Sequence, residues 1–359
     1  MQKLANFVLF FGSLLLMNSS FVQAKCKIHD TFITYGNHFG SNDDPSSYWL
    51  ISMSVKSKEG GEVVNCSPQL TLLSTGDVGE HDEISISPFE TVPYYDADKD
   101  YSRINYRFKV SKSQGSFQNS WTLMTTGEKL GPYKFPQLGI DNGPTTATML
   151  VLADFDLSAA SKPMTDRLPN LDRKKYDMVM HVGDFAYNIQ NQKGARGDEF
   201  FDTMSQSFAR EIPYVVVAGN HERHDKGRMF DFRFKMPNSG NLQDRGNHYY
   251  SFDYKGVHYV TIDWDYVFYL NPGDKSAALM WLKKDLENAY KNPSINFKVF
   301  FSHRPFYCPQ ADGDHCKIFF HTKPFQDVMT KYGIDMYLNS HTHQYYRLKK
   351  QIDFQNYQG

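Results

Sequence analysis

Three things are scarce in this sequence: net charge, cysteine and long apolar segments. The 39 Lys and Arg residues nearly balance the 40 Asp and Glu residues, and a protein that grips nucleic-acid phosphates needs a basic excess, so we expect no nucleic-acid partner. Four cysteines among 359 residues are too few for a disulfide-rich scaffold. The composition, 40% hydrophobic and 22% charged, excludes disorder over most of the chain, and the length favours two domains.

The first 24 residues have the pattern of a secretory signal peptide. Lys3 precedes an apolar run from Phe7 to Met17, and Val22-Gln23-Ala24 places small residues where signal peptidase requires them. The alternative is a membrane anchor, but the run is about 11 residues long and a spanning helix needs about 20. We therefore expect cleavage after Ala24, a secreted protein or one of a lysosomal or other vesicular lumen, and no membrane span in the mature chain.

An oxidising compartment allows the cysteines to pair. Cys308 and Cys316 lie in one short polar loop, which leaves Cys26 and Cys66 for each other. Four cysteines allow three connectivities, and free buried thiols are the alternative, so this pairing is a hypothesis. Asn65-Cys66-Ser67 is formally a glycosylation sequon, although the central cysteine and the following Pro68 make it a poor one.

The chain changes character near residue 145. Residues 25–145 show short alternating or β-branched segments separated by polar turns and no convincing amphipathic helix, which predicts a small all-β sandwich without catalytic groups. Gly and Pro residues mark 131–145 as a linker. The segments expected to be strands are Tyr48–Val55, Gln69–Leu73, Ile104–Val110 and Ser120–Thr125.

Residues 146–359 alternate between buried strands and helices, which predicts an α/β domain. Ala278–Tyr290 is the clearest helix, with leucines on one face. Each apolar run stops at a polar residue, and the main runs are Met149–Asp154, Met178–Asp184, Tyr214–Asn220, Tyr259–Asp263, Val299–His303 and Met336–His341.

Five of these strand ends carry groups that bind metals. They are Asp154, Asp184, Asn220, His303 and His341. Ligands of open α/β folds gather at the carboxyl ends of the strands, and carboxylate, amide and imidazole groups suit divalent or trivalent metals. Taken singly, each residue is more often a turn or helix cap, but five in sequence order are hard to explain that way. Tyr187 and His343 bring the donors to seven, enough for two metals that share a bridging carboxylate.

Several sequence blocks then resemble a known family. Gly183-Asp184-Phe185-Ala186-Tyr187 and Gly219-Asn220-His221-Glu222 are similar to its G-D-x-x-Y and G-N-H-E blocks, and Ser302–Cys308 is similar to the block that holds its next histidine. His341–Arg347 resembles the H-x-H-x-Y-x-R ending. Over residues 149–347 the chain thus resembles the calcineurin-like metallophosphoesterases, and among them the purple acid phosphatases. The N-terminal region resembles the fibronectin type III-like domain of larger members only loosely.

The resemblance implies a β-sheet sandwich flanked by helices and a binuclear metal centre. It implies Fe(III) bound by Asp154, Asp184, Tyr187 and His343, and a divalent ion (Zn, Mn or Fe(II)) bound by Asp184, Asn220, His303 and His341. Asp184 would bridge the two ions, which would activate a hydroxide nucleophile. His221 would protonate the leaving group or orient the substrate.

Some positions depart from the family pattern or stay open. Asp156 replaces a glycine and could crowd the iron, ligate it or point away, and Ser340 replaces the glycine before His341. The chain stops 16 residues after its last histidine, so we expect residues 146–359 to be an incomplete catalytic domain at their C-terminal end. His181 is expected to be a packing residue; Glu222 and His224 could support the ligands. Asp312, Asp314 and His315 could face substrate but are more often ordinary loop residues.

The functional prediction is a secreted acid phosphatase that hydrolyses small phosphate monoesters. One alternative is a phosphodiesterase or nucleotide hydrolase of the same superfamily. Another is a non-catalytic phosphate-binding protein with a decayed site. The physiological substrate and the oligomeric state have no signature in the sequence.

Overall fold

The structure is a computed structural model that describes residues 26–35, 48–56, 58–59, 62–63, 66–74, 83–96, 101–111, 120–136, 146–237, 247–306, 319–345 and 347. Several predictions lie outside these residues: the signal peptide at 1–24, the sequon residue Asn65, the Cys308–Cys316 pair, and the loop residues Asp312, Asp314 and His315.

The N-terminal region consists of strands, as its alternating pattern predicts. It forms two four-stranded antiparallel sheets, with strand orders β1-β2-β8-β7 and β10-β9-β5-β6, and a short β3-β4 pair. The strands are β1 (Ile28–Tyr35), β2 (Tyr48–Lys56), β3 (Lys58–Glu59), β4 (Glu62–Val63), β5 (Gln69–Leu73), β6 (Glu83–Ile86), β7 (Glu90–Asp96), β8 (Tyr101–Ser111), β9 (Ser120–Met124) and β10 (Lys129–Lys134). All four predicted strands are present; the likeness to a fibronectin type III domain remains a prediction.

The predicted linker begins too early. Gly131 and Pro132 lie inside β10, so the first residues of 131–145 are strand. Proline has no N–H to give to a ladder and is tolerated on edge strands. β10 is such an edge, and its register shifts between Leu130 and Tyr133, around the proline. Turn-forming residues therefore mark an irregular edge strand here.

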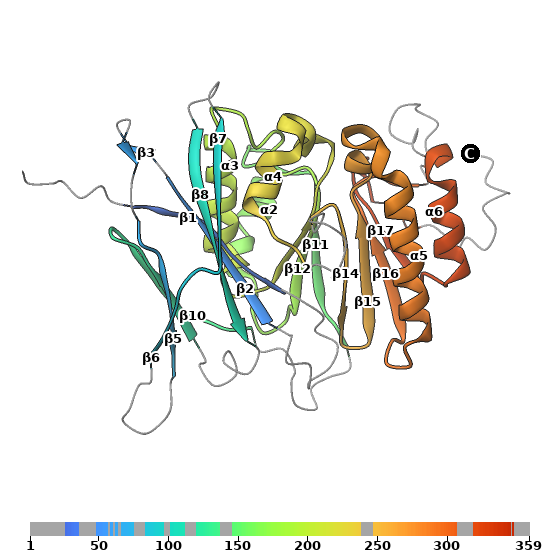
Figure 1. The fold of residues 1–359 in the computed structure, drawn as a ribbon, viewed down its shortest axis with the longest axis horizontal. Coiled ribbons are helices and arrows are strands. Elements are labelled where there is room, and N and C mark those ends of the chain that lie inside the picture. The colour runs from blue at the N-terminus through green and yellow to red at the C-terminus, as the bar shows by residue number, and fades with distance from the viewer. Residues whose placement is uncertain are drawn as a thin grey trace, which may run out of the picture.

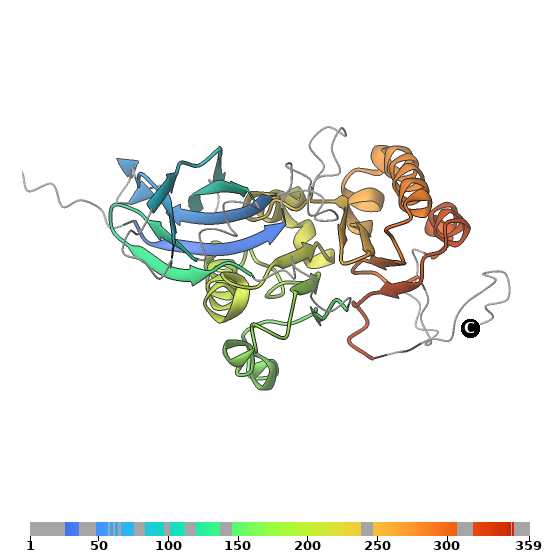
Figure 2. The same cartoon turned by 90° about the horizontal axis from the view of Figure 1, so that it is seen from below.

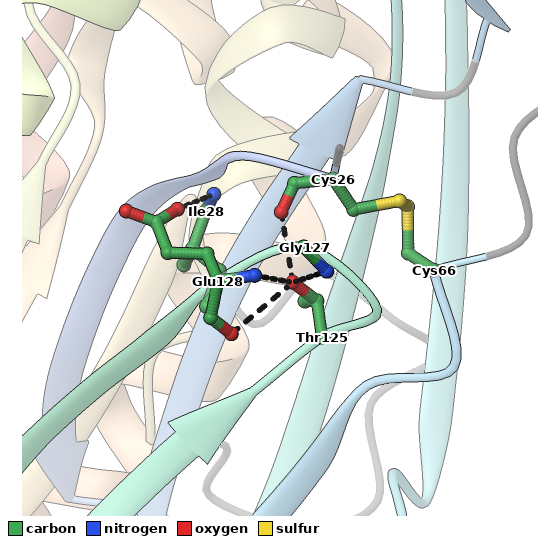
Figure 3. The surroundings of a disulfide bond; sticks show 6 residues. All are labelled: Cys26, Ile28, Cys66, Thr125, Gly127 and Glu128. Atoms are coloured by element: carbon green, nitrogen blue, oxygen red, sulfur yellow. Dashed lines mark hydrogen bonds between the residues drawn. A yellow bond between two sulfur atoms is a disulfide. The ribbon is translucent and has the colours of Figure 1, made fainter. Parts of the chain in front are cut away.

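A disulfide joins Cys26 to Cys66, which confirms this part of the predicted pairing (Figure 3). The Thr125 hydroxyl donates to the Cys26 carbonyl at 2.8 Å and accepts the Glu128 N–H at 3.1 Å (Figure 3). Both cysteines are buried. The bridge and this hydrogen-bonded turn together fix the start of β1 against the second sheet.

Replacing Cys66 by alanine should lower the free energy of unfolding by about 3 kcal/mol, because the cross-link no longer restricts the unfolded chain. The bridge spans 40 residues in sequence. Urea unfolding of the variant gives the value, and the wild-type protein treated with a reductant should show the same loss. Equal stability of the oxidised and reduced proteins would contradict the expectation.

The second region is α/β and contains two further sheets. β11-β12-β13 is parallel, and in the sheet β14-β15-β16-β17 only the β14-β15 pair is antiparallel. The strands are β11 (Met149–Leu152), β12 (Met178–Val182), β13 (Tyr214–Val217), β14 (Tyr249–Tyr254), β15 (Val257–Ile262), β16 (Phe297–Phe301) and β17 (Met336–Leu338). All six predicted apolar runs overlap one of these strands.

The helices lie between and outside the sheets. α5 and α6 cover the outer side of the β14–β17 sheet, at the opposite end of the molecule from the N-terminal strands (Figures 1 and 2). None of the helices in the described part of the chain has the length and apolarity required to cross a membrane. The α-helices are α2 (Lys162–Thr165), α3 (Ala195–Met204), α4 (Arg228–Arg233), α5 (Lys275–Lys291) and α6 (Phe319–Lys331), and the shorter 3-10 and π helices are η1 (Leu168–Asn170), η2 (Ser205–Ala209), η3 (Asn220–Gly227), η4 (Tyr266–Leu270) and η5 (Pro272–Asp274).

The two α/β sheets face each other across a shared core. The Tyr250 hydroxyl from β14 donates to the Val216 carbonyl of β13 at 2.6 Å, and its ring packs against Phe301 of β16. This is the sheet sandwich with flanking helices that the sequence resemblance implies. It brings the strand ends of both sheets toward one another.

The N-terminal strands share that core rather than standing apart from it. Phe32 of β1 packs against Phe201 of α3, Tyr214 of β13 and Phe234, with ring centroids 5.2–5.8 Å apart. One cluster of buried apolar side chains runs through both regions. The β1-β2-β8-β7 sheet therefore supports the α/β region directly.

A buried ion cluster crosses the same boundary. Arg233 of α4 is fully buried and pairs with Asp30 of β1 and with Asp198 of α3, the latter at 2.7 Å. Asp198 also accepts from Tyr101 at 2.6 Å and pairs with Arg103, both of β8. The Arg233 guanidinium thus joins α3 and α4 of the α/β region to β1 and β8 of the N-terminal sheet.

Two buried histidines, His248 and His258, each lie between two carboxylates. Those carboxylates are Asp231 and Asp263 for His248, and Asp253 and Asp285 for His258. Burial by itself lowers the pKa of both imidazoles, but the adjacent carboxylates outweigh it and raise each pKa to about 9. The ordinary value is 6.5.

The protein should therefore lose stability between pH 6.5 and 9. A group whose pKa is raised in the folded state contributes stability that is complete below its unfolded pKa and is lost as the pH rises through the folded one. We expect a loss on the order of 2 kcal/mol for each histidine, measured by urea unfolding at pH 6 and pH 9.5. His248→Gln and His258→Gln should each flatten the dependence, whereas the exposed His224→Gln should leave it unchanged. A wild-type protein equally stable at both pH values would contradict this.

Candidate metal centre

The predicted donors lie just beyond the ends of strands. Asp154 follows β11, Asp184 follows β12, Asn220 follows β13, His303 follows β16 and His341 follows β17. β11, β12 and β13 are parallel, so their carboxyl ends share one edge. Five of the seven donors adopt left-handed backbone conformations, with φ of 54° at Asp154, 55° at Asp184, 42° at Tyr187, 77° at His341 and 53° at His343. Such conformations cost free energy and concentrate at functional sites.

Three of the donors form a tight buried group. One ligand atom from each of Asp184, His303 and His341 lies within 4.8 Å of the other two, and all three residues are buried. His303 Nε2 lies 3.0 Å from His341 Nδ1 and 3.3 Å from Asp184 Oδ2. Asn220 Oδ1 lies 3.1 Å from the same His303 nitrogen. The four predicted ligands of the divalent ion are therefore together.

The remaining donors adjoin this group. The Tyr187 hydroxyl donates to the Asp154 carbonyl at 2.8 Å and lies 3.0 Å from His343 Nε2. Asp154 Oδ2 accepts the His341 N–H at 3.0 Å, which ties the two halves of the site together. Burial raises the pKa of Asp154 and of Tyr187, and the charge of Asp184 acts on both groups as well and raises each pKa further. All seven predicted donors thus belong to one cluster.

The donor set fits a cation. Asp154 Oδ1 is buried without a hydrogen-bond partner and lies 3.5 Å from His343 Nε2, so a carboxylate oxygen of the cluster has lone pairs free for a cation. Burial and the charge of Asp154 raise the pKa of the Tyr187 hydroxyl, and its phenolate would need a strongly charged ion such as Fe(III). Carboxylates, a phenol and one imidazole on one side, and two imidazoles with an amide on the other, match the chemistry of a mixed-metal pair.

The charges of the cluster favour bound positive charge. Burial opposes ionisation of Asp184, but the His303 imidazole lowers its pKa to about 2. Burial likewise opposes the charge of His303, but Asp184 raises its pKa to about 9. The negative charge of Asp154 also raises the pKa of His303. The field that favours a proton on His303 favours a metal cation at the same place.

Two glycines allow the close approach of these side chains. A Cβ atom at Gly219 would lie 2.3 Å from Asp184 Oδ1, and one at Gly183 would lie 2.6 Å from His303 Nδ1. Gly183 also has φ of 85°. Any larger residue in place of the glycines of the G-D and G-N-H-E blocks would therefore overlap the side chain of Asp184 or His303.

Glu222 supports the site, a role that the sequence left open. It is buried, and its carboxylate accepts the backbone N–H groups of Asp184 at 2.9 Å, Phe185 at 3.0 Å and Gly219 at 2.8 Å. Burial and the charge of Asp184 raise its pKa to about 8, whereas the N–H donors oppose that rise. Glu222 thereby joins the loops after β12 and β13. His224 is exposed.

His221 lies at the open side of the cluster. Its N–H donates to Asp184 Oδ1 at 3.0 Å, and its Nε2 lies 3.8 Å from Asp184 Oδ2. Its Nδ1 lies 3.0 Å from Asn188 Oδ1, a contact that the sequence did not indicate. With its side chain one-third exposed, at 33%, His221 can reach both solvent and the cluster.

The two departures from the family pattern have definite partners. Asp156 points away from the donors: its carboxylate pairs with Arg196 at 2.7 Å and accepts the Ser158 N–H at 2.9 Å. The Ser340 hydroxyl lies 2.5 Å from the Val182 carbonyl and 2.9 Å from His303 Nδ1. Neither residue takes a ligand position.

His181 packs inside the core, as expected. Its ring stacks on Phe155 with centroids 5.0 Å apart, and its Nδ1 lies 2.7 Å from the Tyr214 hydroxyl. Burial lowers the pKa of His181 to about 3, so it is neutral. It does not belong to the donor cluster.

Sequence reasoning missed a cationic group behind His341. Arg304 Nη1 lies 3.0 Å from His341 Nε2, and the same guanidinium donates twice to Asp265, at 2.8 and 3.0 Å. Arg304 directly follows His303 in its sequence block, which was the available signal. Nothing in the sequence placed Asp265 beside it.

Comparison with known proteins gives a family and several relatives. Residues 152–345 match the calcineurin-like phosphoesterase family. Acid phosphatase type 7 of Homo sapiens is 31% identical over 221 residues, which are 57% of this chain and 48% of that protein. The Mus musculus protein of the same name is 32% identical over 224 residues, 58% of this chain and 49% of that protein.

A plant relative is more distant. Purple acid phosphatase 18 of Arabidopsis thaliana is 28% identical over 215 residues, 56% of this chain and 45% of that protein. The chain therefore spans about half the length of the curated relatives it matches.

Proposed function

This chain belongs to the calcineurin-like phosphoesterase family and is similar to the purple acid phosphatases, and we propose that it hydrolyses small phosphate monoesters at acidic pH. The observation that carries the proposal is the convergence of seven metal-type donors from five strand ends onto one cluster. We extend the proposal to a secreted or vesicular location, in keeping with the signal-like first 24 residues.

We assign the donors to two ions. Asp154, Tyr187 and His343 would hold Fe(III), and Asn220, His303 and His341 would hold Zn, Mn or Fe(II). Asp184 would serve both ions. When bound, such a pair supplies an activated water and neutralises the oxygens of the phosphate.

The chain's own groups orient the site. The Val182 carbonyl, 2.9 Å from His303 Nδ1, holds the proton of that imidazole there and leaves Nε2 facing the donors. Glu222 fixes the backbone N–H groups at Asp184 and Gly219. Asn188 holds the Nδ1 proton of His221, so Nε2 is the atom placed to give a proton to the leaving oxygen.

Metal content, absorption and activity of the full chain test the proposal together. We expect two metals per chain, hydrolysis of an aryl phosphate near pH 5, weak activity on an aryl diester, and a visible phenolate-to-iron band. Tyr187→Phe should remove the band, whereas the exposed Tyr290→Phe should keep it. Fewer than two metals with no turnover would overturn the proposal, and turnover of diesters without the band would favour a phosphodiesterase.

His221→Ala should lower kcat by a factor on the order of 100 with the metal content unchanged, because general acid catalysis is lost. The effect should be smaller for an aryl phosphate with a very acidic phenol, whose leaving oxygen needs no proton. His224→Ala, three residues along the same segment, is the control. Equal losses for good and poor leaving groups would contradict the assigned role.

A further inference from the structure

Beside the proposed divalent site lies a cluster that the proposed chemistry does not use. It consists of Arg223 of η3, Asp265, Tyr269 of η4 and Arg304. Arg304 and Asp265 are buried, whereas Arg223 is 36% exposed in its side chain and Tyr269 is 49% exposed. The cluster therefore has a buried base and an open rim.

The charges of this cluster do not balance. Asp265 is a single carboxylate, and Arg304 already holds both its oxygens through two hydrogen bonds of 2.8 and 3.0 Å. Arg223 Nε only approaches the same carboxylate, at 3.3 Å. Arg223 is thus the surplus cation, at a rim that the solvent reaches.

Arg223 is held in place but retains free donors. Its Nε donates to the Asn220 carbonyl at 3.3 Å, and its guanidinium lies 4.9 Å from the centre of the Tyr269 ring. Among the residues that the structure describes, its two terminal nitrogens have no hydrogen-bond or ion-pair partner. Two N–H groups of a positioned guanidinium match the two oxygens of a carboxylate or phosphate.

Contacts with neighbouring residues connect the Arg223 guanidinium to two proposed metal ligands. Arg223 is hydrogen-bonded to the backbone carbonyl of Asn220, a proposed metal ligand. Through Asp265 and Arg304 it is also linked to His341, a second ligand of the same ion. An anion bound at Arg223 would therefore lie next to a phosphate held at the donor cluster, at a fixed spacing.

We propose that Arg223 selects phosphate monoesters whose leaving group carries a second anionic group, a carboxylate or another phosphate. The inference rests on the proposed phosphatase function and adds a substrate class to it. Tyr269 would flank the bound leaving group and hold Arg223 by its ring face. Arg223 would act in binding and specificity, with no part in the chemical step.

The test compares two matched substrates, 4-carboxyphenyl phosphate and 4-carbamoylphenyl phosphate, which differ by one negative charge. We expect the full, metal-loaded chain to prefer the carboxylate about tenfold in kcat/KM, as one charge-assisted contact allows. Arg223→Gln should abolish the preference, because kcat/KM falls more for the carboxylate substrate than for the carbamoyl substrate. Arg228→Gln, 61% exposed and on the next helix, should retain it.

Binding separates this proposal from the phosphatase function. Titration calorimetry with benzylphosphonate and 4-carboxybenzylphosphonate makes the same comparison without turnover. Turnover of both esters with no preference, or equal losses for both in Arg223→Gln, would overturn the role of Arg223 and leave the phosphatase function standing. A charge preference in binding without any turnover would support the role of Arg223 and overturn the phosphatase function. A protein that binds neither phosphonate and turns over neither ester would overturn both.

Discussion

Replacing Asp184 by asparagine should reduce hydrolysis of an aryl phosphate by a factor of about 1,000 or more and lower the metal content below two per chain. Asparagine has the same shape but carries no charge. Asp184 is buried, accepts the His221 N–H at 3.0 Å and lies 3.3 Å from His303 Nε2. Loss of its charge would remove the one ligand that we assign to both ions.

Metal analysis and steady-state kinetics on the same preparation check this result. Asp156→Asn is the matched control, because Asp156 also lies just beyond a parallel strand, β11, but pairs with Arg196. The control should keep both its metals and its rate. An Asp184→Asn protein with two metals and near wild-type turnover would exclude a bridging role for this residue.

Replacing Arg233 by methionine should lower the free energy of unfolding by about 3–5 kcal/mol, because the buried Asp30 loses its counterion and Asp198 keeps only Arg103. Arg233 pairs with Asp30 through Nη1 and with Asp198 through Nη2, and Nη2 also donates to the Tyr101 hydroxyl at 2.7 Å. Burial raises the pKa of Asp30 to about 7 even though the Arg233 charge acts against that rise. Without the guanidinium, both carboxyl groups should resist ionisation more strongly.

The loss should depend on pH in a definite direction. At pH 5 the Asp30 and Asp198 carboxyl groups of the variant can be buried in their neutral, protonated form. At pH 8 both carboxyl groups are ionised in the unfolded chain, so folding must either protonate them or bury them as ions, and both cost free energy. Urea unfolding should therefore show a larger deficit at pH 8 than at pH 5. Lys162→Met, which removes an exposed ion pair, should change stability by less than about 1 kcal/mol. A deficit for Arg233→Met no larger than that of Lys162→Met would refute the assignment.

The strands and their polar ends could be predicted because their signals are local. An apolar run that stops at Asp184 or His303 reports both a buried strand and its exposed end within a few residues. The resemblance of the sequence blocks then grouped the seven donors. The structure brings all seven together.

Other features could not be predicted because their partners are far apart in sequence. Asp265 and Arg304 are 39 residues apart, and Asp30 and Arg233 are 203 apart. Asp156 had three possible orientations until the structure placed Arg196 beside it. Gly131 and Pro132 indicated a linker, but pairing with β9 makes their segment an edge strand.

By itself, the sequence determined the strands, the clearest helix, the Cys26–Cys66 hypothesis and the set of metal-type donors, since each depends on periodicity, spacing or side-chain chemistry. The tertiary structure alone decided which charges face each other: the Arg233 cluster that joins the N-terminal sheet to the α/β region, and the surplus guanidinium of Arg223 beside the donors. The physical reason is that the interaction energy and the pKa of a charged group depend on its burial and on neighbours a few ångströms away. Strand order and sheet packing, rather than position along the chain, determine those neighbours.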